Sequence, residues 1–248
     1  TKATENSFEL SDEVGVVITK SNGSVYADNC KFVYDGTYLK SSNGLKWYDG
    51  NSACEVLVYY PYKLDYSSNS SYSYSVAVDQ SSYSAFIGSD LLVGTAKGAV
   101  PGKNAVNVPL KHNCTQFQVQ INNKSSETIQ SVKFLALEYY QLLFYNFTGV
   151  SGSGVAPEDI IPYHETIGEN NIYKAIVPST QSSYFQVEIK TSSGTHLYKT
   201  KEKFLFEPGT IYQVSITLDN SGNNADVSIS SQFQGWNVSV ISVFDDDY

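Results

Sequence analysis

Apolar and polar residues alternate with a period of two along much of the chain, which is the pattern of β-strands with one buried face. The segment Val132–Phe147 is rich in Tyr, Phe and Val, and this composition favours a buried strand. Turn sequences rich in Gly, Asn and Asp separate the strands and predict hairpins. The pattern therefore predicts an all-β protein, and its clearest alternating series are Val14/Val16/Ile18, Val106/Val108/Leu110, Phe117/Val119/Ile121, Phe185/Val187/Ile189, Tyr212/Val214/Ile216/Leu218, Val227/Ile229 and Trp236/Val238/Val240.

The length of 248 residues is compatible with two small domains or with one large β domain. Glycine and proline interrupt the chain between Asp90 and Asn107, before strand alternation restarts at Val106. We place a domain boundary there, which predicts an N-terminal domain at residues 1–105 and a C-terminal domain at residues 106–248. Residues 65–75 and 149–162 are predicted to be irregular loops, because Ser, Tyr, Asn, Gly and Pro dominate them.

All 16 cationic residues are Lys, and the formal net charge is −9. A chain with no Arg and an excess of carboxylates is poorly suited to recognise phosphates, so we expect no nucleic-acid partner. No apolar run reaches the length of a membrane-spanning helix. The start Thr1-Lys2-Ala3 and the absence of Met suggest that a leader segment has been removed.

The residues that could support catalysis do not form motifs. His112, His164 and His196 lie in separate segments, and none belongs to a zinc-binding or hydrolase motif. His112 continues the alternation of Val108 and Leu110, so we expect a hydrogen-bonded histidine in the core or at its rim. We therefore predict no enzymatic activity, no metal site and no cofactor.

The three cysteines are too few for a disulfide scaffold and do not have metal-ligand spacing. Cys30 and Cys54 precede or open apolar runs, so they either form a cross-strand bridge or serve as small buried side chains. Cys114 is unpaired in both cases.

Tyrosines alternate with serines in the region of the first predicted loop. This composition is typical of adaptable contact surfaces, because Tyr offers a rigid amphipathic area at low entropic cost. We therefore consider a contact surface there, with a solvated hairpin as the alternative. The tyrosines of this candidate surface are Tyr66, Tyr72, Tyr74 and Tyr83.

Several short segments, in the same order along the chain, resemble the fimbrillin family, the subunits and adhesins of the type V pili of Gram-negative anaerobes. The start of the chain resembles the Thr-Arg-Ala-Thr start of that family, and a later strand resembles its Tyr-Tyr-Pro-Tyr signature. The segments that carry the resemblance are Thr1–Val16, Val56–Tyr62, Asp90–Gly94, Val108–His112, Phe117–Ile121, Ile176–Pro178, Phe206–Tyr212 and Gly235–Trp236.

The resemblance implies two tandem, mostly antiparallel β-sandwich domains of transthyretin-like type. It also implies export as a lipoprotein and display at the outer membrane or cell surface within a fimbrium, with membrane contact only through a removed or upstream lipid anchor. In polymerising members, cleavage after an Arg removes a first strand, and another subunit fills the open groove with a donated strand. Lys2, followed by Ala3, stands where that Arg is common, so a Lys-tolerant protease acts, cleavage lies upstream, or this member is not processed.

The C-terminal segment has the composition of a donated strand. Trp236, Val238 and Val240 fall on one face, and Ile241, Val243 and the neighbouring Phe244 are offset from them by one residue. The alternative is that this segment is the last strand of the second domain.

The leading functional hypothesis is a non-catalytic fimbrial subunit or adhesin that binds other pilus subunits by strand donation and contacts a host or bacterial surface receptor. The alternative is a glycan-binding outer-membrane lipoprotein, with the Tyr-rich loops and Trp47-Tyr48 as its sugar platform. A hydrolase is the least favoured class, because no acid and base pair is evident.

Overall fold

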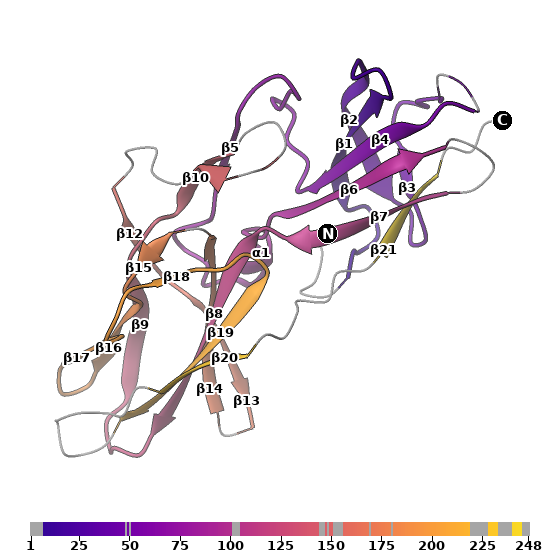
Figure 1. Cartoon of the computed structure of the whole chain (residues 1–248). Coiled ribbons are helices and arrows are strands. Elements are labelled where there is room, and N and C mark those ends of the chain that lie inside the picture. Colours follow the sequence, from indigo (N-terminus) through magenta and orange to yellow (C-terminus); the bar gives the residue numbers. More distant parts are fainter. Residues whose placement is uncertain are drawn as a thin grey trace.

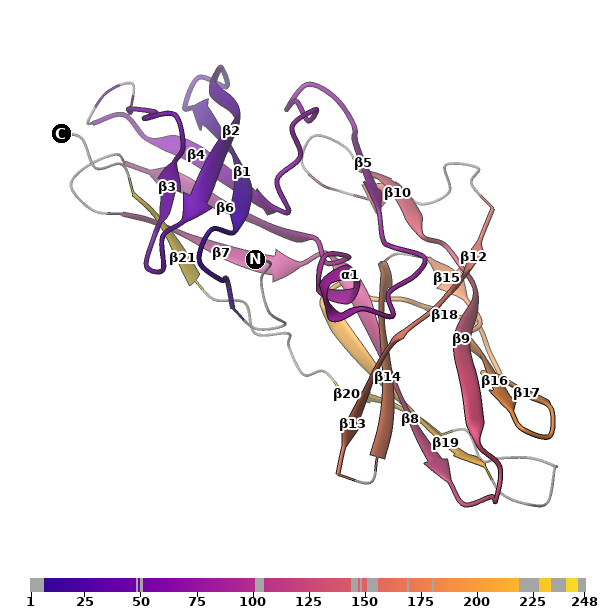
Figure 2. The same cartoon turned by 180° about the vertical axis from the view of Figure 1, so that it is seen from behind.

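The computed structural model describes residues 7–47, 49, 51–100, 105–143, 147, 149–150, 156–168, 170–179, 181–218, 228–232 and 240–244, and for 149–150, 228–232 and 240–244 it describes only the backbone. The chain forms two β-rich units (Figures 1 and 2). The described part contains a single short helix, α1 (Tyr83–Ile87). The prediction of an all-β protein is therefore confirmed, including strands within the segment 132–147.

The first unit is a closed barrel in which the strand order is β1-β2-β3-β21-β7-β6-β4. Its core consists of the inward-facing residues of the alternating series, among them Val14, Val16 and Val108. The strands of this unit close into a barrel because β21 joins the two edges that would otherwise remain open. The barrel strands are β1 (Glu13–Lys20), β2 (Val25–Tyr34), β3 (Leu39–Ser41), β4 (Cys54–Tyr60), β6 (Leu92–Ala99), β7 (Val106–His112) and β21 (Val240–Phe244).

The second unit is a sandwich of two larger sheets. One contains β13 (Tyr163–Ile167), β14 (Asn170–Pro178), β8 (Cys114–Asn123), β19 (Thr210–Leu218) and β20 (Ser228–Gln232), and the other contains β12 (Glu158–Ile160), β9 (Ile129–Leu137), β16 (Gln186–Thr191) and β17 (Thr195–Lys199). Small sheets join β11 (Gly149–Val150), β10 (Tyr140–Leu143) and β5 (Tyr72–Ser75), and β15 (Ser182–Ser183) with β18 (Phe204–Leu205).

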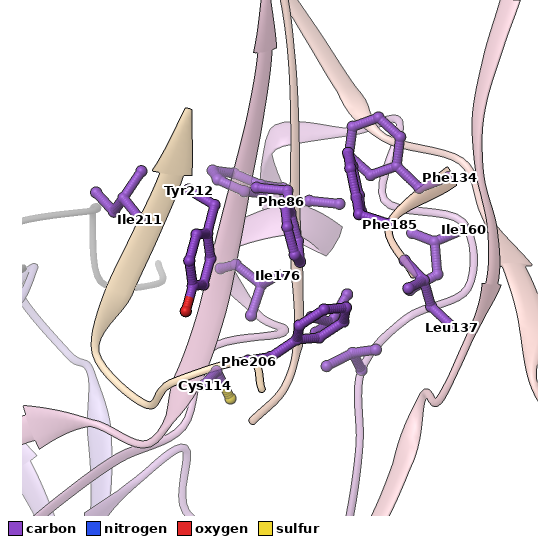
Figure 3. Close-up of a cluster of buried hydrophobic side chains, with 14 of the residues drawn as sticks. Phe86, Cys114, Phe134, Leu137, Ile160, Ile176, Phe185, Phe206, Ile211 and Tyr212 are labelled. Carbon is purple, nitrogen blue, oxygen red and sulfur yellow. The ribbon is translucent and has the colours of Figure 1, made fainter. Parts of the chain in front are cut away.

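Aromatic side chains fill the space between these two sheets. The ring of Phe117, on β8, stacks on that of Phe185 with 4.0 Å between centroids, and Phe134, on β9, meets Phe185 edge-on. Figure 3 shows Phe185 and Phe134 on one side of this cluster and Tyr212 on the other. All four rings are almost fully buried, so they form the centre of the second core.

The boundary between the two units differs from the predicted one at residues 105 and 106. β7 belongs to the barrel, so the second unit starts at β8, and β21 returns to the barrel from the far end of the chain. Conversely, β5 and α1 lie within the predicted N-terminal domain but belong to the second unit. β5 pairs with β10, and α1 buries Phe86 and Ile87 in the second core. Gly94 lies inside β6 and not in a linker. The chain therefore crosses between the units several times, and neither predicted domain is a contiguous structural unit.

Polar contacts hold the segment between β5 and α1 against the second unit. The Gln80 side chain accepts a hydrogen bond from the Ile176 amide at 2.9 Å and donates one to the Ile176 carbonyl at 2.7 Å. Gln80 thus pairs with β14 as a neighbouring strand would, although it lies almost a hundred residues earlier in sequence. The side chain is completely buried, so this pair fixes the position of the segment.

The two units meet where a tyrosine of the barrel packs on a glycine. Val58 and Tyr60 of β4 point into the barrel, while Tyr59 between them points outward into the second core. Tyr59 lies opposite Gly15 of β1. A Cβ atom on Gly15 would lie 2.0 Å from a ring carbon of Tyr59, so this position requires glycine.

Gly15→Ala is therefore expected to reduce the free energy of unfolding by about 1 to 3 kcal/mol or more, because the Tyr59 ring must move out of a packed site. Urea denaturation followed by tyrosine and tryptophan fluorescence measures this change. Gly194→Ala is the matched control, because a Cβ atom at that turn would have no other atom within 4 Å. Equal stability of the two variants would contradict this interpretation of Gly15.

Candidate assembly site

The C-terminal strand β21 closes the barrel by pairing on both sides. It runs antiparallel to β7, with Val240 opposite Pro109, Ile241 opposite Val108 and Val243 opposite Val106. On its other side it runs parallel to β3, where Val243 and Phe244 lie opposite Leu39 and Lys40. This short strand therefore joins two strands that are not paired with each other in the described barrel.

The walls of this position are apolar on the inside. Val106, Val108 and Leu110 of β7 are buried, and the residues between them are exposed. Leu39 of β3 is completely buried. β6 pairs only with the far half of β7, from Leu110 to His112. Removal of β21 would thus expose backbone groups of β3 and β7 beside an apolar interior.

The structure settles the position of the C-terminal strand within its own chain. Residues 240–244, which include Val240, Ile241, Val243 and Phe244 of the predicted donor segment, lie in the barrel of the first unit and not at the end of the second. Trp236 and Val238 lie outside the described residues, as do Lys2 and Ala3 of the predicted processing site.

The predicted tyrosine contact surface is wrong for three of its four members. Tyr66, Tyr72 and Tyr74 are only 6%, 3% and 4% exposed and belong to the second core. Tyr72 and Tyr74 lie on β5, where the serines between them are exposed, so the Tyr-Ser alternation is that of a half-buried strand. Only Tyr83, which is 40% exposed, lies on the surface.

These tyrosines form an aromatic cluster between the two units. The rings of Tyr59, Tyr66, Tyr72 and Phe147 lie within 5.5 Å of one another, centroid to centroid. Burial raises the pKa of the Tyr66 hydroxyl to about 12 and that of Tyr59 further. The Tyr59 hydroxyl donates to the Asn29 side-chain oxygen at 2.6 Å. The cluster therefore has a structural role in which the tyrosine hydroxyls remain protonated.

Trp47, the described half of the Trp47-Tyr48 platform, is partly buried and packs against the barrel core. Tyr48 lies outside the described residues. Together with the burial of the loop tyrosines, this position does not support the sugar platform considered from the sequence.

His112 occupies the buried position that the sequence predicts. Its Nδ1 atom lies 2.6 Å from a carboxylate oxygen of Asp90, and both side chains are largely buried. His112 is the last residue of β7, and Asp90 lies two residues before β6, so the pair joins neighbouring parts of the barrel near the start of β8. The expectation of a hydrogen-bonded histidine at this site is confirmed.

The other two histidines also have structural contacts. His164 stacks on Tyr173, and its Nε2 atom lies 3.1 Å from the Asn171 side-chain oxygen. His196 uses the same nitrogen, Nε2, toward the Thr191 hydroxyl and the Glu127 carboxylate. A Ser-His-acid relay needs the hydroxyl and the carboxylate on opposite ring nitrogens, so this group does not form one.

The cysteines are free thiols, and Cys54 and Cys114 are buried. The bridge between Cys30 and Cys54 is therefore not formed, and burial raises the pKa of the Cys54 thiol. Within the described ranges, no group of three or more His, Cys, Asp or Glu side chains is arranged to hold a metal ion. The same residues include no helix that is both long and apolar enough to cross a membrane.

The molecule therefore belongs to a class of β proteins with two units. One unit is a barrel that a strand from the far end of the chain completes, and the other is a β-sandwich joined to it. The sequence model of the family described as fimbrillin-like matches residues 1–236. The chain therefore belongs to the fimbrillin-like family, as its sequence motifs predict. No curated protein matches the chain.

Solved structures share the fold at low sequence identity. A putative cell adhesion protein from Bacteroides ovatus aligns with a TM-score of 0.73 and 14% identity, over 100% of this chain and 92% of its own. One from Bacteroides uniformis aligns with a TM-score of 0.70 and 15% identity, over 93% and 96%. The tip fimbrial protein Mfa3 from Porphyromonas gingivalis, with a C-terminal truncation, aligns with a TM-score of 0.55 and 9% identity, over 94% and 97%.

His112→Ala is expected to destabilise the protein by about 3 kcal/mol, because it leaves the Asp90 carboxylate buried without its partner. The double variant His112→Ala/Asp90→Ala should lose less stability than the two single variants combined, since no lone charge remains. Urea denaturation of the four proteins gives this coupling energy. Strictly additive losses would show that the pair makes no specific contribution.

The aromatic cluster predicts that stability declines at alkaline pH. An unfolded tyrosine has a pKa of about 10, whereas Tyr66 in the folded chain has a pKa of about 12. Above pH 10 the unfolded state loses the proton first, so the free energy of unfolding falls as pH rises through this interval. Tyr66→Phe should make this decline shallower in urea titrations between pH 9 and 12, whereas the surface variant Tyr83→Phe should not.

Proposed function

We propose that this protein is a non-catalytic subunit or adhesin of a cell-surface fimbria, and that it joins other subunits by exchange of the C-terminal strand. Membership of the fimbrillin-like family and the fold shared with proteins described as fimbrial or cell adhesion proteins support this role. The observation that carries the assembly mode is the position of β21 between β3 and β7, contributed from the far end of the chain.

Physical chemistry favours exchange at this position. β3 and β7 present unpaired amides and carbonyls on either side of an apolar interior once β21 leaves. A strand from a second subunit would restore the same backbone pairing and would cover the same apolar walls. The position between β3 and β7 requires a strand with the right pairing register, but it does not require that the strand belong to the same chain. A strand of the same chain and a strand of another chain can therefore compete for it.

The remaining parts of the proposal concern maturation and location. Proteolytic trimming at Lys2-Ala3, an upstream lipid anchor and display at the outer membrane follow from the resemblance to polymerising family members. The partners are then other pilus subunits, together with a receptor on a host or bacterial surface. The structural contacts of all three histidines support a role without catalysis.

A complementation experiment tests strand exchange directly. A chain that lacks residues 235–248 should bind a synthetic peptide of that segment in trans, and peptide binding should raise the melting temperature of the truncated chain. Calorimetry and thermal unfolding measure both effects. A truncated chain that remains folded but does not bind the peptide would contradict the proposed assembly mode.

Two peptide variants test the register. Directly opposed residues of an antiparallel pair share a face, and position 241 lies opposite the buried Val108, whereas position 242 lies opposite the exposed Asn107. The peptide with Ile241→Asp should therefore bind at least tenfold more weakly, because its carboxylate meets the apolar interior. The Ser242→Asp peptide carries the same charge and should bind normally. Equal binding of the two would contradict the register.

A further inference from the structure

Outside the assembly site, one surface of the second unit combines an aromatic ring with a cluster of lysines. Tyr184 and Phe185 are adjacent in the segment between β15 and β16 and differ in burial. Phe185 is buried against Phe117, while Tyr184 is partly exposed. The core residue thus holds its neighbour at a defined place on the outer surface.

Hydrogen bonds fix the turn that faces Tyr184. The Thr200 hydroxyl accepts a hydrogen bond from the Phe185 amide and donates one to the Glu202 carbonyl, and the Thr200 amide donates to the Phe185 carbonyl. Thr200 is only 8% exposed. These hydrogen bonds therefore hold the turn between β17 and β18 against the segment that carries Tyr184, and they fix the backbone positions of the lysines in and beside this turn.

Two of these lysines converge on the same ring. The Lys199 Nζ atom lies 3.8 Å from the Tyr184 ring centroid, and that of Lys203 lies 5.6 Å away. Lys201, which lies between these two lysines in the sequence, is exposed. Among the described residues, no carboxylate lies within 4.0 Å of any of these three ammonium groups. The exposed Glu202 lies in the same turn, so the three lysines and this carboxylate leave a local excess of positive charge beside an aromatic ring, in a chain of net charge −9.

We propose that Tyr184, Lys199 and Lys203 form a binding site for an acidic polysaccharide whose sugars are uronates. The apolar C–H face of a pyranose packs on an aromatic ring, because the negative π-face attracts the slightly positive hydrogens. A uronate carries its carboxylate at the edge of the sugar ring and leaves the face free for this contact. The flexible lysine side chains can then turn from the ring to the carboxylate and keep their charge paired.

The side chains at this surface favour a uronate over two other anionic candidates. A phosphate polymer is recognised best by the bidentate guanidinium of arginine, and the chain contains no arginine. A membrane of anionic lipids is attracted by larger groups of basic residues than the three present here. A sulfated sugar is the remaining competitor for the ring and its flanking ammonium groups, and dextran sulfate represents it in the test below.

This site is separate from the strand-exchange position. β17 and β18, which carry or flank the three lysines, belong to the second unit, and β21 belongs to the barrel (Figures 1 and 2). Binding of a polysaccharide therefore does not require assembly, and it is tested on the chain of residues 1–248 without added subunits. Failure of one proposal leaves the other intact.

The test compares binding of the full chain to immobilised polygalacturonate and to its fully methyl-esterified form, which retains the sugars but lacks the charges. We expect binding to polygalacturonate at low salt and at least tenfold weaker binding to the ester. Tyr184→Ala and the double variant Lys199→Gln/Lys203→Gln should each weaken binding to polygalacturonate about tenfold, or roughly 1.4 kcal/mol. Tyr184→Phe retains the ring and should bind as the natural chain does.

Lys97→Gln/Lys124→Gln is the matched control, because it removes the same charge from exposed lysines elsewhere. It should retain binding, and circular dichroism should show that all variants are folded. If Tyr184→Ala does not fold, the surface lysine variants still decide the outcome. Lack of binding by the natural chain, equal binding to the ester, or an equal loss in the control would overturn the proposal. Dextran sulfate or phosphatidylserine vesicles bound in preference to polygalacturonate would overturn it as well.

Discussion

The packing of the Tyr59 ring on the backbone of Gly15 is the constraint on which the two-unit arrangement depends. One strand, β4, serves two cores, because its alternate residues face the barrel interior and the second unit. The outward side of this strand pair is buried under Tyr66, Tyr72 and Phe147, so the barrel and the sandwich are joined by an aromatic core and not by a flexible linker. A side chain at position 15 would displace the Tyr59 ring from this core.

The sequence predicts the strands and most hairpins because both depend on local patterns. It also predicts the buried state of His112, which continues an alternating series. Sheet membership cannot be obtained in this way. The alternation of β7 is the same whether this strand starts a second domain or completes a barrel. One of its two partner strands, β21, lies more than a hundred residues later in the sequence. The predicted boundary therefore separated strands that the fold places in one sheet.

The tyrosines show a second limit of sequence interpretation. Composition alone led to the expectation of a contact surface, whereas the period of two in Tyr72 and Tyr74 is equally the pattern of a half-buried strand. The Tyr184 surface, by contrast, has no sequence motif, because it requires Thr200 to bring two lysines over a ring from an adjacent strand and turn. Such a juxtaposition is a property of tertiary structure.

The closure of the barrel by residues 240–244 also affects the order in which the chain can fold. Residues 72–232 contain all the strands of the sandwich, and these precede the strand that completes the barrel. During synthesis or export that proceeds from the N-terminus, the sandwich can form while the barrel still has an open seam. The barrel, which contains the first strand of the chain, is thus completed last. Until then the backbone groups of β3 and β7 at this seam remain unpaired, and an unpaired edge of this kind favours aggregation.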